Sequence, residues 1–400
     1  MEKRFIILFL TGFFIAGFCS GQKTESDTQK GYTFTMVKQL KATPVKNQHR
    51  SGTCWSFASI SLIESEMLRM GKAITDLSEM YVVRKSYMDK ARRYVRMHGK
   101  FNFTSGGAAN DAFDVIKKYG MLPEEVYPGL LPREDDHIHG EMDCLLNAMV
   151  QAVIKNKNKR LSRQWQKAFK GALDAYLGEV PEKFTYQGKK YTPQSFAENA
   201  VSINPDDYVM ITSFTHHPFY EHFIIELPDN WSWEEACNVK LEELTETIDH
   251  AINNGFSVVW ATDVSEKGFS WDNGIAVVPE MEFPETAGME KEKWDDMSDN
   301  EKKKLIYSFE NVVIEKNITQ EIRQEEFDNY QTTDDHGMHI LGIAKDQTGK
   351  KFYYVKNSWD TDNPYNGYLY ASENYVKFKT ISILLHKDGV PDDIRKKLGI

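Results

Sequence analysis

The sequence predicts an α+β fold, because helical patterns fill its first part and strand patterns fill its last part. From Cys54 to Met67, apolar residues recur at helical spacing, and Gly71 follows as a stop signal. After about Ser257, the apolar residues fall into short runs rich in Val, Ile, Tyr and Phe, bounded by turns. The chain has 400 residues, enough for one large domain or for two modest lobes.

Residues 1–21 have the layout of a secretory signal peptide. A short basic start precedes an apolar run at residues 5–18, and small residues follow up to Gly21. That run is shorter than the roughly 20 residues that span a bilayer. We expect cleavage after Gly21 and export to a periplasmic or secreted location, with a lipoprotein anchored at Cys19 as the alternative. Because no later stretch is long and apolar enough, we expect no transmembrane segment in the mature chain.

The elements after the export signal can be taken in order. Residues 22–31 are polar and predict a flexible leader. Residues 106–127 have the pattern of a glycine loop, a helix and a stop, and residues 141–200 are mostly helical. Strands are predicted at residues 208–211, 222–227, 257–262, 275–279, 336–344, 351–357 and 367–370.

The charge of the chain bears on its partners. The net charge is −10, which argues against DNA or RNA, because phosphate binding needs a clustered excess of Lys and Arg. One basic run lies in the helical middle of the chain, and we interpret it as a solvated helix face. It comprises Lys155, Lys157, Lys159, Arg160, Arg163, Lys167 and Lys170. We therefore predict no nucleic-acid partner.

Cys54 has the setting of a catalytic thiol. It stands at or next to a predicted helix N-terminus, where free N–H groups and the helix dipole favour a thiolate. Gln48 lies earlier in the same tight loop, so its side-chain N–H and the backbone N–H of Cys54 can bind an oxyanion. A cysteine alone is more often a buried core residue, so the interpretation depends on its partners.

His336 and Asn357 are the partners that such a thiol needs. His336 opens one predicted strand and Asn357 ends the next, so a hairpin of adjacent strands would bring them together. Asn357 can then orient the imidazole, and Trp359 can shield that bond from water. His339 is a rival base, but it faces the opposite side of an alternating strand.

Three segments resemble the papain-like cysteine peptidases. Residues 48–58 (QHRSGTCWSFA) resemble their nucleophile segment, and residues 335–338 (DHGM) with 341–343 (LGI) resemble their histidine segment. Residues 356–359 (KNSW) with 366–368 (NGY) resemble their asparagine segment. Three motifs in the same order are far more specific than one motif alone.

The chain also resembles one branch of these enzymes, the bleomycin hydrolase and aminopeptidase C family. The segments that carry this resemblance are residues 105–107 (SGG), 118–123 (KYGMLP), 176–185 (YLGEVPEKFT) and 192–196 (TPQSF). The resemblance covers about residues 40–385.

This resemblance implies a papain-like two-lobed fold with a long, mainly helical insert. The helical lobe with Cys54 would occupy residues 32–130 and the family-specific insert residues 131–250. The β-rich lobe with the catalytic histidine and asparagine would occupy residues 251–385. A C-terminal tail at residues 386–400 would follow.

The resemblance also implies substrate-binding residues. Gly106 and Gly107 match glycines that hydrogen-bond the substrate backbone, since the missing Cβ atoms let a peptide lie close. Members of this family act mainly as aminopeptidases, because the chain's own C-terminus blocks one side of the cleft. The carboxylate of Ile400 would then pair with the substrate ammonium. Asp360 and Gly337 depart from the family pattern, in which Gly and Ala are usual.

A group of histidines has two interpretations, a metal site and a surface cluster. His216, His217 and His222 lie near Glu221, which suggests a metal site. Adjacent histidines on an extended segment point apart, and no spaced Cys or Asp pattern supports them. We therefore predict a surface cluster and no metal.

The cysteines also leave two interpretations. Removal of residues 1–21 leaves Cys54, Cys144 and Cys237, an odd number. Exported proteins often oxidise their cysteines, so a Cys144–Cys237 disulfide is one interpretation. Three free thiols are preferred, because nothing in the local sequence favours the bridge.

These observations predict an exported thiol aminopeptidase that hydrolyses peptides through an acyl-enzyme and needs no metal or organic cofactor. An endopeptidase of the same chemistry is the nearest alternative, if the tail does not fill the cleft. A catalytically idle peptide-binding protein is the alternative from another class, and peptidyl transfer is a third. A homo-oligomer is left open, because the insert is shorter than in the family.

Overall fold

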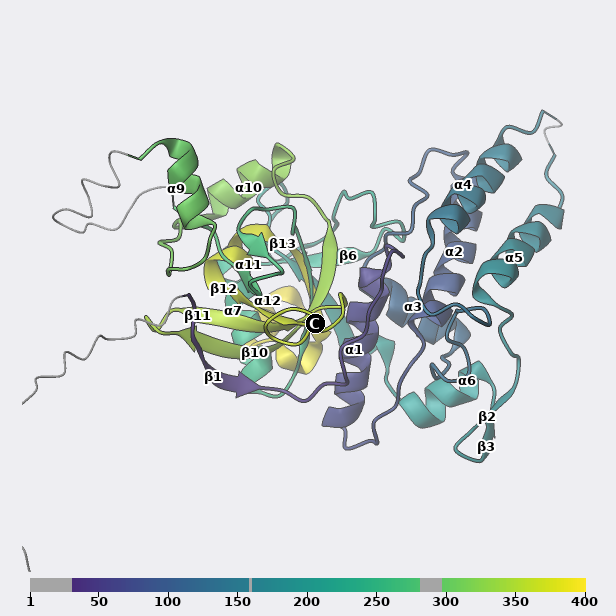
Figure 1. Ribbon diagram of the computed structural model, residues 1–400. Helices are drawn as coiled ribbons and strands as arrows, with labels where there is room; N and C mark the ends of the chain where they lie inside the picture. The colour runs from purple at the N-terminus through teal and green to yellow at the C-terminus, as the bar shows by residue number, and fades with distance from the viewer. Residues whose placement is uncertain (1–30, 158–159, 281–296) are drawn as a thin grey trace, which may run out of the picture.

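The computed structural model describes residues 31–157, 160–280 and 297–400. Figure 1 shows a helical part beside a part built on a β-sheet. The predicted signal peptide (residues 1–21) and nearly all of the predicted leader lie outside the described residues. Within the described ranges, no helix has the length and apolar character needed to cross a membrane.

The helical part is built from helices early in the chain and in the middle segment. They are α1 (Cys54–Arg69), α2 (Glu79–Arg96), α3 (Asn110–Tyr119), α4 (Gly140–Ile154), α5 (Gln164–Leu177) and the short α6 (Pro193–Phe196), followed by the π-helical turn η1 (Ala197–Val201) and the 3₁₀ turn η2 (Pro205–Asp207). A small hairpin of β2 (Phe184–Tyr186) and β3 (Lys189–Tyr191) packs its aromatic rings around Phe196. Side chains from all six helices share one apolar cluster, which holds this part together.

The other part is organised by an eleven-stranded sheet within the described residues. Its hydrogen-bonded order is β5 (His222–Ile224), β6 (Glu235–Asn238), β4 (Tyr208–Thr212), β13 (Thr380–His386), β7 (Val258–Thr262), β10 (His336–Asp346), β11 (Lys351–Lys356), β12 (Tyr368–Ser372), β9 (Ile275–Ala276) and β8 (Phe269–Ser270), with β1 (Phe34–Gln39) paired to β10. The helices of this part are α7 (Leu241–Asn253), α9 (Asp299–Ile306), α10 (Gln320–Asp328), α11 (Glu373–Lys379) and α12 (Asp392–Leu398).

The sheet crosses two of the segment boundaries that we drew from the sequence. Strand β1 lies in the segment assigned to the helical lobe, yet it pairs antiparallel with β10. Strand β4 lies in the segment assigned to the insert, yet it pairs antiparallel with β13, and β6 and β5 continue from it. Backbone pairing therefore places both segments in the sheet. The free N–H and C=O groups of an edge strand can pair with any segment that reaches them, whatever its place in the sequence.

Helix α1 lies where the two parts meet, and Figure 1 shows it between the sheet and the other helices. Every residue from Trp55 to Met67 is buried. A helix with no exposed face needs apolar or satisfied polar partners on all sides. The chain turns away after the helix at Gly71, whose positive φ of 76° suits glycine.

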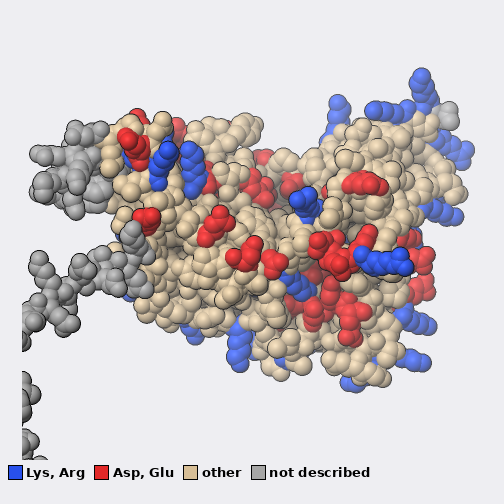
Figure 2. All heavy atoms as spheres, viewed as in Figure 1, with Lys and Arg blue, Asp and Glu red and all other residues tan. Residues whose placement is uncertain are grey.

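Basic side chains gather at one end of the visible surface. Figure 2 shows blue side chains gathered at the outer end of the helical part, where Figure 1 places the free ends of α4 and α5. Red side chains are spread more widely over the same view, with the largest group on the lower face of the helical part. Apart from Lys159, which lies outside the described residues, the predicted basic run spans the end of α4 and the start of α5, away from the junction of the two parts.

Candidate active site

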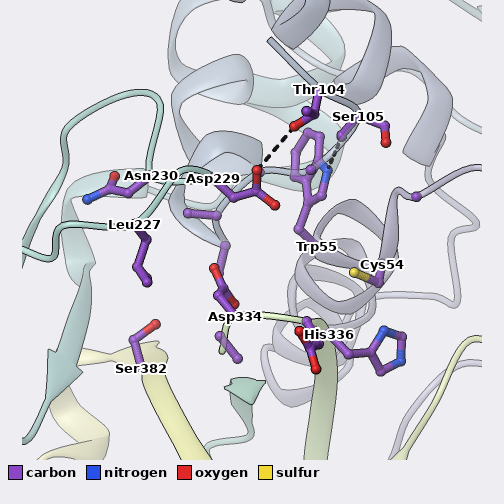
Figure 3. A pocket seen from close by; sticks show the side chains of 18 of the residues that line it. Cys54, Trp55, Thr104, Ser105, Leu227, Asp229, Asn230, Asp334, His336 and Ser382 are labelled. Atoms are coloured by element: carbon purple, nitrogen blue, oxygen red, sulfur yellow. Dashed lines mark hydrogen bonds between the residues drawn. The ribbon is translucent and has the colours of Figure 1, made fainter. Parts of the chain in front are cut away.

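Cys54 is the first residue of α1 and lies at the junction of the two parts. The turn before it includes Gly52, whose φ is 59° and whose missing Cβ leaves room for the Ser105 side chain. The Thr53 carbonyl accepts the backbone N–H of Ser56 at 2.9 Å, which starts the helix. Figure 3 shows the Cys54 sulfur at the N-terminus of this helix, facing a cavity.

His336 and Asn357 meet through the β10–β11 hairpin. His336 is the first residue of β10, and Asn357 directly follows β11. The distance from His336 Nε2 to Asn357 Oδ1 is 2.6 Å, and Ser358 N–H donates to the same oxygen at 2.8 Å. Because Asn357 Oδ1 is the acceptor, Nε2 carries the proton and Nδ1 keeps its lone pair.

Trp359 covers the histidine–asparagine pair. The centroids of the Trp359 and His336 rings are 4.5 Å apart, with their planes tilted by 33°. His336 and Asn357 are both buried. Exclusion of water strengthens the bond that orients the imidazole.

Ser358 holds Gln48 in place in the loop before Cys54. The backbone N–H of Gln48 donates to the Ser358 carbonyl at 2.9 Å, and the Ser358 hydroxyl donates to Gln48 Oε1 at 2.7 Å. The amide orientation is therefore fixed, with Nε2 left to donate elsewhere. Together with the backbone N–H of Cys54, this amide can supply the two donors of an oxyanion hole.

The thiol differs from the sequence-based expectation of a lowered pKa. Burial raises the pKa of the Cys54 thiol to about 12, and the carboxylates of Asp334 and Asp229 add to the rise. Hydrogen bonds from the Gly337 and Trp55 backbone N–H groups lower that pKa, but they do not offset burial. Burial likewise lowers the pKa of His336 to about 4. Burial thus favours the neutral form of both groups.

The two residues that depart from the family pattern have structural reasons. A Cβ on Gly337 would lie 3.3 Å from the Trp55 Cα, so glycine lets β10 pack tightly against the start of α1. Asp360 has a φ of 67°, in the left-handed region that favours glycine and that aspartate also tolerates. Its carboxylate accepts the Thr361 backbone N–H at 2.7 Å, a local bond that suits this turn.

Cys54, His336 and Gln48 open into one cavity of about 500 Å³. Gly106 and Gly107 form part of its wall, as the sequence predicts for substrate-binding glycines. A Cβ on Gly106 would overlap Asp229 Oδ2, and a Cβ on Gly107 would lie 2.6 Å from Asp111 Oδ2. A side chain at Gly106 would thus collide with a distant loop, and one at Gly107 with the start of α3 and with the Trp55 ring.

The structure does not bring Ile400 to this cavity. Helix α12 buries Ile394 and Leu398 in the apolar cluster of the sheet part, and Ile400 packs against the same cluster. The Lys397 ammonium donates to Glu243 Oε1 on α7 at 2.8 Å, which fixes the helix there. The expected pairing of the Ile400 carboxylate with a substrate ammonium therefore has no counterpart in this arrangement.

Three residues around the cavity were not identified from the sequence. Ser358, Asp229 and Asp334 take part in the site, and the two aspartates line the cavity wall. Ser358 follows directly after Asn357, so its position in the asparagine segment was a usable signal. No local pattern marks Asp229, because its place depends on contacts between segments far apart in the chain.

His339 lies outside the cavity lining. Its Nδ1 is 2.9 Å from the Ser61 hydroxyl, on the second turn of α1. His339 is buried, and it is His336, not His339, that is hydrogen-bonded to Asn357. The structure thus brings His336, rather than His339, to Asn357.

Two histidines of the suspected metal cluster share a carboxylate, although it is not Glu221. Nε2 of His216 and Nε2 of His217 each lie 3.3 Å from an oxygen of Glu226. Gln324 donates its Nε2 to His216 Nδ1 at 3.0 Å, while its Oε1 accepts the Thr215 N–H. His216 Nε2 must then carry a proton, so it offers no lone pair to a metal ion. His222 lies elsewhere, 3.5 Å from the Cys237 sulfur.

The three described cysteines are free thiols. Cys144 is exposed on α4, whereas Cys237 is buried in the sheet part. The alternative of a Cys144–Cys237 disulfide is therefore wrong for this structure.

Comparison with known proteins agrees with this geometry. Residues 17–399 match the model of the Peptidase C1-like family. The chain belongs to that family. It is a cysteine-type peptidase, and the papain-like fold and family that we inferred from the sequence are confirmed. The boundaries of the insert, the lobes and the tail remain predictions, because the family match does not divide the chain.

The named relatives are distant but align over most of the chain. Aminopeptidase G from Lactobacillus delbrueckii subsp. lactis is 21% identical over 401 residues, covering 90% of this chain and 85% of the relative. Aminopeptidase C from Streptococcus thermophilus is 22% identical, covering 91% and 84%. The crystal structure of PepW from Lactobacillus rhamnosis superposes with a TM-score of 0.68 at 19% identity, covering 91% of this chain and 84% of that chain. At this identity the structural likeness shows the fold.

Proposed function

We propose that this protein is an exported cysteine aminopeptidase that removes N-terminal residues from peptides through Cys54, His336 and Asn357. One observation carries the proposal: His336, which lines the cavity that Cys54 faces, lies 2.6 Å from the side-chain oxygen of Asn357. The names of the relatives, aminopeptidase G and aminopeptidase C, support the same reaction.

The mechanism begins with proton transfer between two neutral groups. His336 Nδ1 takes the Cys54 proton as the sulfur attacks the scissile carbonyl, and Asn357 keeps the imidazole in the tautomer that this step needs. The negative charge passes to the carbonyl oxygen, where Gln48 Nε2 and the Cys54 N–H bind it. His336 then donates the proton to the leaving amine, which departs and leaves a thioester.

Hydrolysis of the thioester completes the cycle. Water attacks the acyl carbon while His336 Nδ1 takes its proton, and the same two donors bind the second oxyanion. Collapse expels the Cys54 sulfur, which recovers the proton from His336. Each step uses groups of this chain and water, so we expect the reaction to need no metal or organic cofactor.

The export of the enzyme rests on the pattern of residues 1–21 alone. Cell fractionation and N-terminal sequencing test it. A mature chain that begins after Gly21 supports export in free form, and a lipidated Cys19 supports the anchored form. A full-length chain in the cytoplasm contradicts both.

An endopeptidase is the second candidate, and one observation favours it. Helix α12 holds the described end of the chain against α7, so the tail does not occupy the cavity beside Cys54. A peptide with residues on both sides of the scissile bond would then meet no obstruction from Ile400. The two candidates differ in whether the substrate needs a free α-amino group.

The deciding experiment uses purified residues 22–400 with Cys54→Ala as the control. Hydrolysis of aminoacyl fluorogenic amides with a free amine is compared with hydrolysis of the N-acetylated versions. Cleavage of only the free-amine set, lost in the control, is the expected result. Cleavage of the acetylated set would establish the endopeptidase, and cleavage of neither would favour the catalytically idle alternative.

A further inference from the structure

Two aspartates form what we call the acidic wall of the catalytic cavity. Asp229 comes from the loop after β5, and Asp334 lies just before His336. Figure 3 shows both side chains on one side of the cavity, with Cys54 and His336 on the other. Both carboxylates are near enough to the sulfur to raise the pKa of Cys54. The acidic wall therefore lies within reach of a substrate whose carbonyl is at Cys54.

The Asp229 carboxylate is held in place over Gly106. Its Oδ1 accepts the Thr104 hydroxyl at 3.2 Å and the Asn102 side-chain amide at 3.4 Å. Its Oδ2 occupies the space that a Cβ on Gly106 would fill. One oxygen is thus engaged by two neutral donors, and the other lies against the bare backbone of the cavity wall.

The loop that carries Asp229 is tied to the helical part on both sides. The Trp231 indole N–H donates to Asp111 on α3, and Arg93 on α2 donates to the Ser232 carbonyl at 2.6 Å. Asn230 closes the loop on itself, since its amide donates to the Ile225 and Glu234 carbonyls. A carboxylate on such a loop is positioned before a ligand arrives, which reduces the cost of binding.

Neither carboxylate of the acidic wall has an ion-pair partner among the described residues. Lys90 is a buried cation in the same region; its ammonium donates to the Thr104 and Gly106 carbonyls, and it interacts first with the charge of Asp111 and second with that of Asp229, without an ion-pair contact to Asp229. Burial and the like charges of Asp229 and Asp335 raise the pKa of Asp334 to about 7. A cation from outside the chain would relieve this repulsion.

The rest of the cavity lining indicates which kind of cation would bind there. Beyond the aspartates, apolar side chains of Met210, Ile225, Leu227 and Val259 line the wall. Apolar walls with two convergent charged groups favour a ligand that combines an ammonium with an adjoining apolar side chain. The N-terminal residue of a peptide has this composition.

We propose that Asp229 and Asp334 bind the α-ammonium group of the peptide substrate and so restrict cleavage to the bond after its first residue. The inference rests on the proposed function and names the residues that make the enzyme an aminopeptidase. Since Asp229 lies over Gly106, an acylated N-terminus extended along this wall meets a fixed carboxylate. The acidic wall then acts both as the anchor of a free N-terminus and as the obstruction to a longer one.

The test compares Asp229→Asn, Asp334→Asn and the double variant with wild type on matched free-amine and N-acetyl aminoacyl amides. Each single variant is expected to lower kcat/KM on the free-amine substrate about 10- to 100-fold, mainly through KM. Activity on the acetylated substrate should be unchanged or raised, because the aspartate that obstructs an acylated N-terminus loses its charge. Asp206→Asn, an exposed aspartate paired with Lys117, is the matched control and should change neither.

A second measurement keeps the inference testable without turnover. The rate at which iodoacetamide alkylates Cys54 is measured with and without leucinamide. Leucinamide carries the ammonium but is a poor substrate, and it should slow the alkylation in wild type. Protection that is lost in the aspartate variants and kept in Asp206→Asn supports the acidic wall, even if wild type hydrolyses neither substrate. Equal protection in all variants would overturn it.

Two further outcomes would also overturn the inference while leaving the peptidase intact. One is an unchanged preference for free amines in both single variants and in the double variant. The other is efficient cleavage of an N-acetyl peptide amide that has arginine as the second residue before the scissile bond, if that cleavage is lost in Asp334→Asn. That result would show that the acidic wall binds a basic side chain of an endopeptidase substrate.

Discussion

The two sides of the catalytic cavity differ in how they are built. On one side, Gln48 and Cys54 come from the loop and helix start of α1, and His336 and Asn357 come from the β10–β11 hairpin. The acidic wall combines Asp334, two residues before His336, with Asp229, which lies on a distant loop that is bonded to α2 and α3. Each catalytic residue thus lies in a recognisable local motif, whereas the place of Asp229 in the acidic wall depends on how distant segments pack.

The largest effect should come from the nucleophile itself. Cys54→Ala removes the attacking sulfur, so kcat/KM on a free-amine amide should fall at least about 10⁴-fold. Cys144→Ala is the matched control, since it removes an exposed thiol on α4 and should leave activity unchanged. Equal losses in both variants would show that Cys54 is not the nucleophile.

A smaller loss should follow when the oxyanion donor is removed. Gln48→Ala should lower kcat about 10²- to 10³-fold with little change in KM, because the amide acts on charge that develops in the transition state. Ser358→Ala should lower kcat only about 10-fold, since it releases Gln48 Oε1 without removing the donor. A change confined to KM in Gln48→Ala would contradict this role.

Gly106→Ala tests the acidic wall from the opposite side. The added Cβ would overlap Asp229 Oδ2 and push the carboxylate out of position. KM for free-amine substrates should rise about 10-fold, and the double variant with Asp229→Asn should add little to either single change. Additive effects in this cycle would show that Gly106 and Asp229 act independently. Gly171→Ala, at an open position on α5, is the control.

The smallest effect concerns stability and its dependence on pH. An unfolded aspartate has a pKa of about 3.9, whereas burial raises the pKa of folded Asp334 to about 7. The folded state therefore binds this proton more tightly, so the Asp334 contribution to stability falls as pH rises from about 4 to about 7. Asp334→Asn should raise Tm by about 2 °C at pH 8 and leave it unchanged at pH 4.

Thermal unfolding of wild type and Asp334→Asn at the two pH values checks this prediction. The exposed change Asp206→Asn should show no such pH-dependent difference. A Tm difference of the same size at both pH values would mean that the substitution alters packing and not ionisation.

The catalytic side could be predicted from the sequence because its determinants are short-range. Helix α1 begins at Cys54 as its periodicity indicates, and β10 and β11 bring His336 to Asn357 as a hairpin should. Strand β1 shows the limit, since its pairing with β10 joins residues that are far apart in the chain.

Two expectations about the site failed for the same physical reason. The helix N-terminus does favour a thiolate at Cys54, but burial by both parts of the molecule is the larger effect and raises the thiol pKa. The expected role of Ile400 assumed a tail in the cleft, whereas the apolar face of α12 packs on the sheet part. Burial is set by tertiary packing, which no local pattern reports.

The most direct test of the account is a crystal structure of the enzyme with leucinal, an amino aldehyde that adds reversibly to a catalytic thiol. The account predicts a bond from the Cys54 sulfur to the aldehyde carbon and an oxygen that faces Gln48 Nε2. It further predicts an ammonium within about 3 Å of an oxygen of Asp229 or Asp334. An adduct whose ammonium points away from both aspartates would contradict the proposed specificity, and the absence of any adduct at Cys54 would contradict the proposed chemistry.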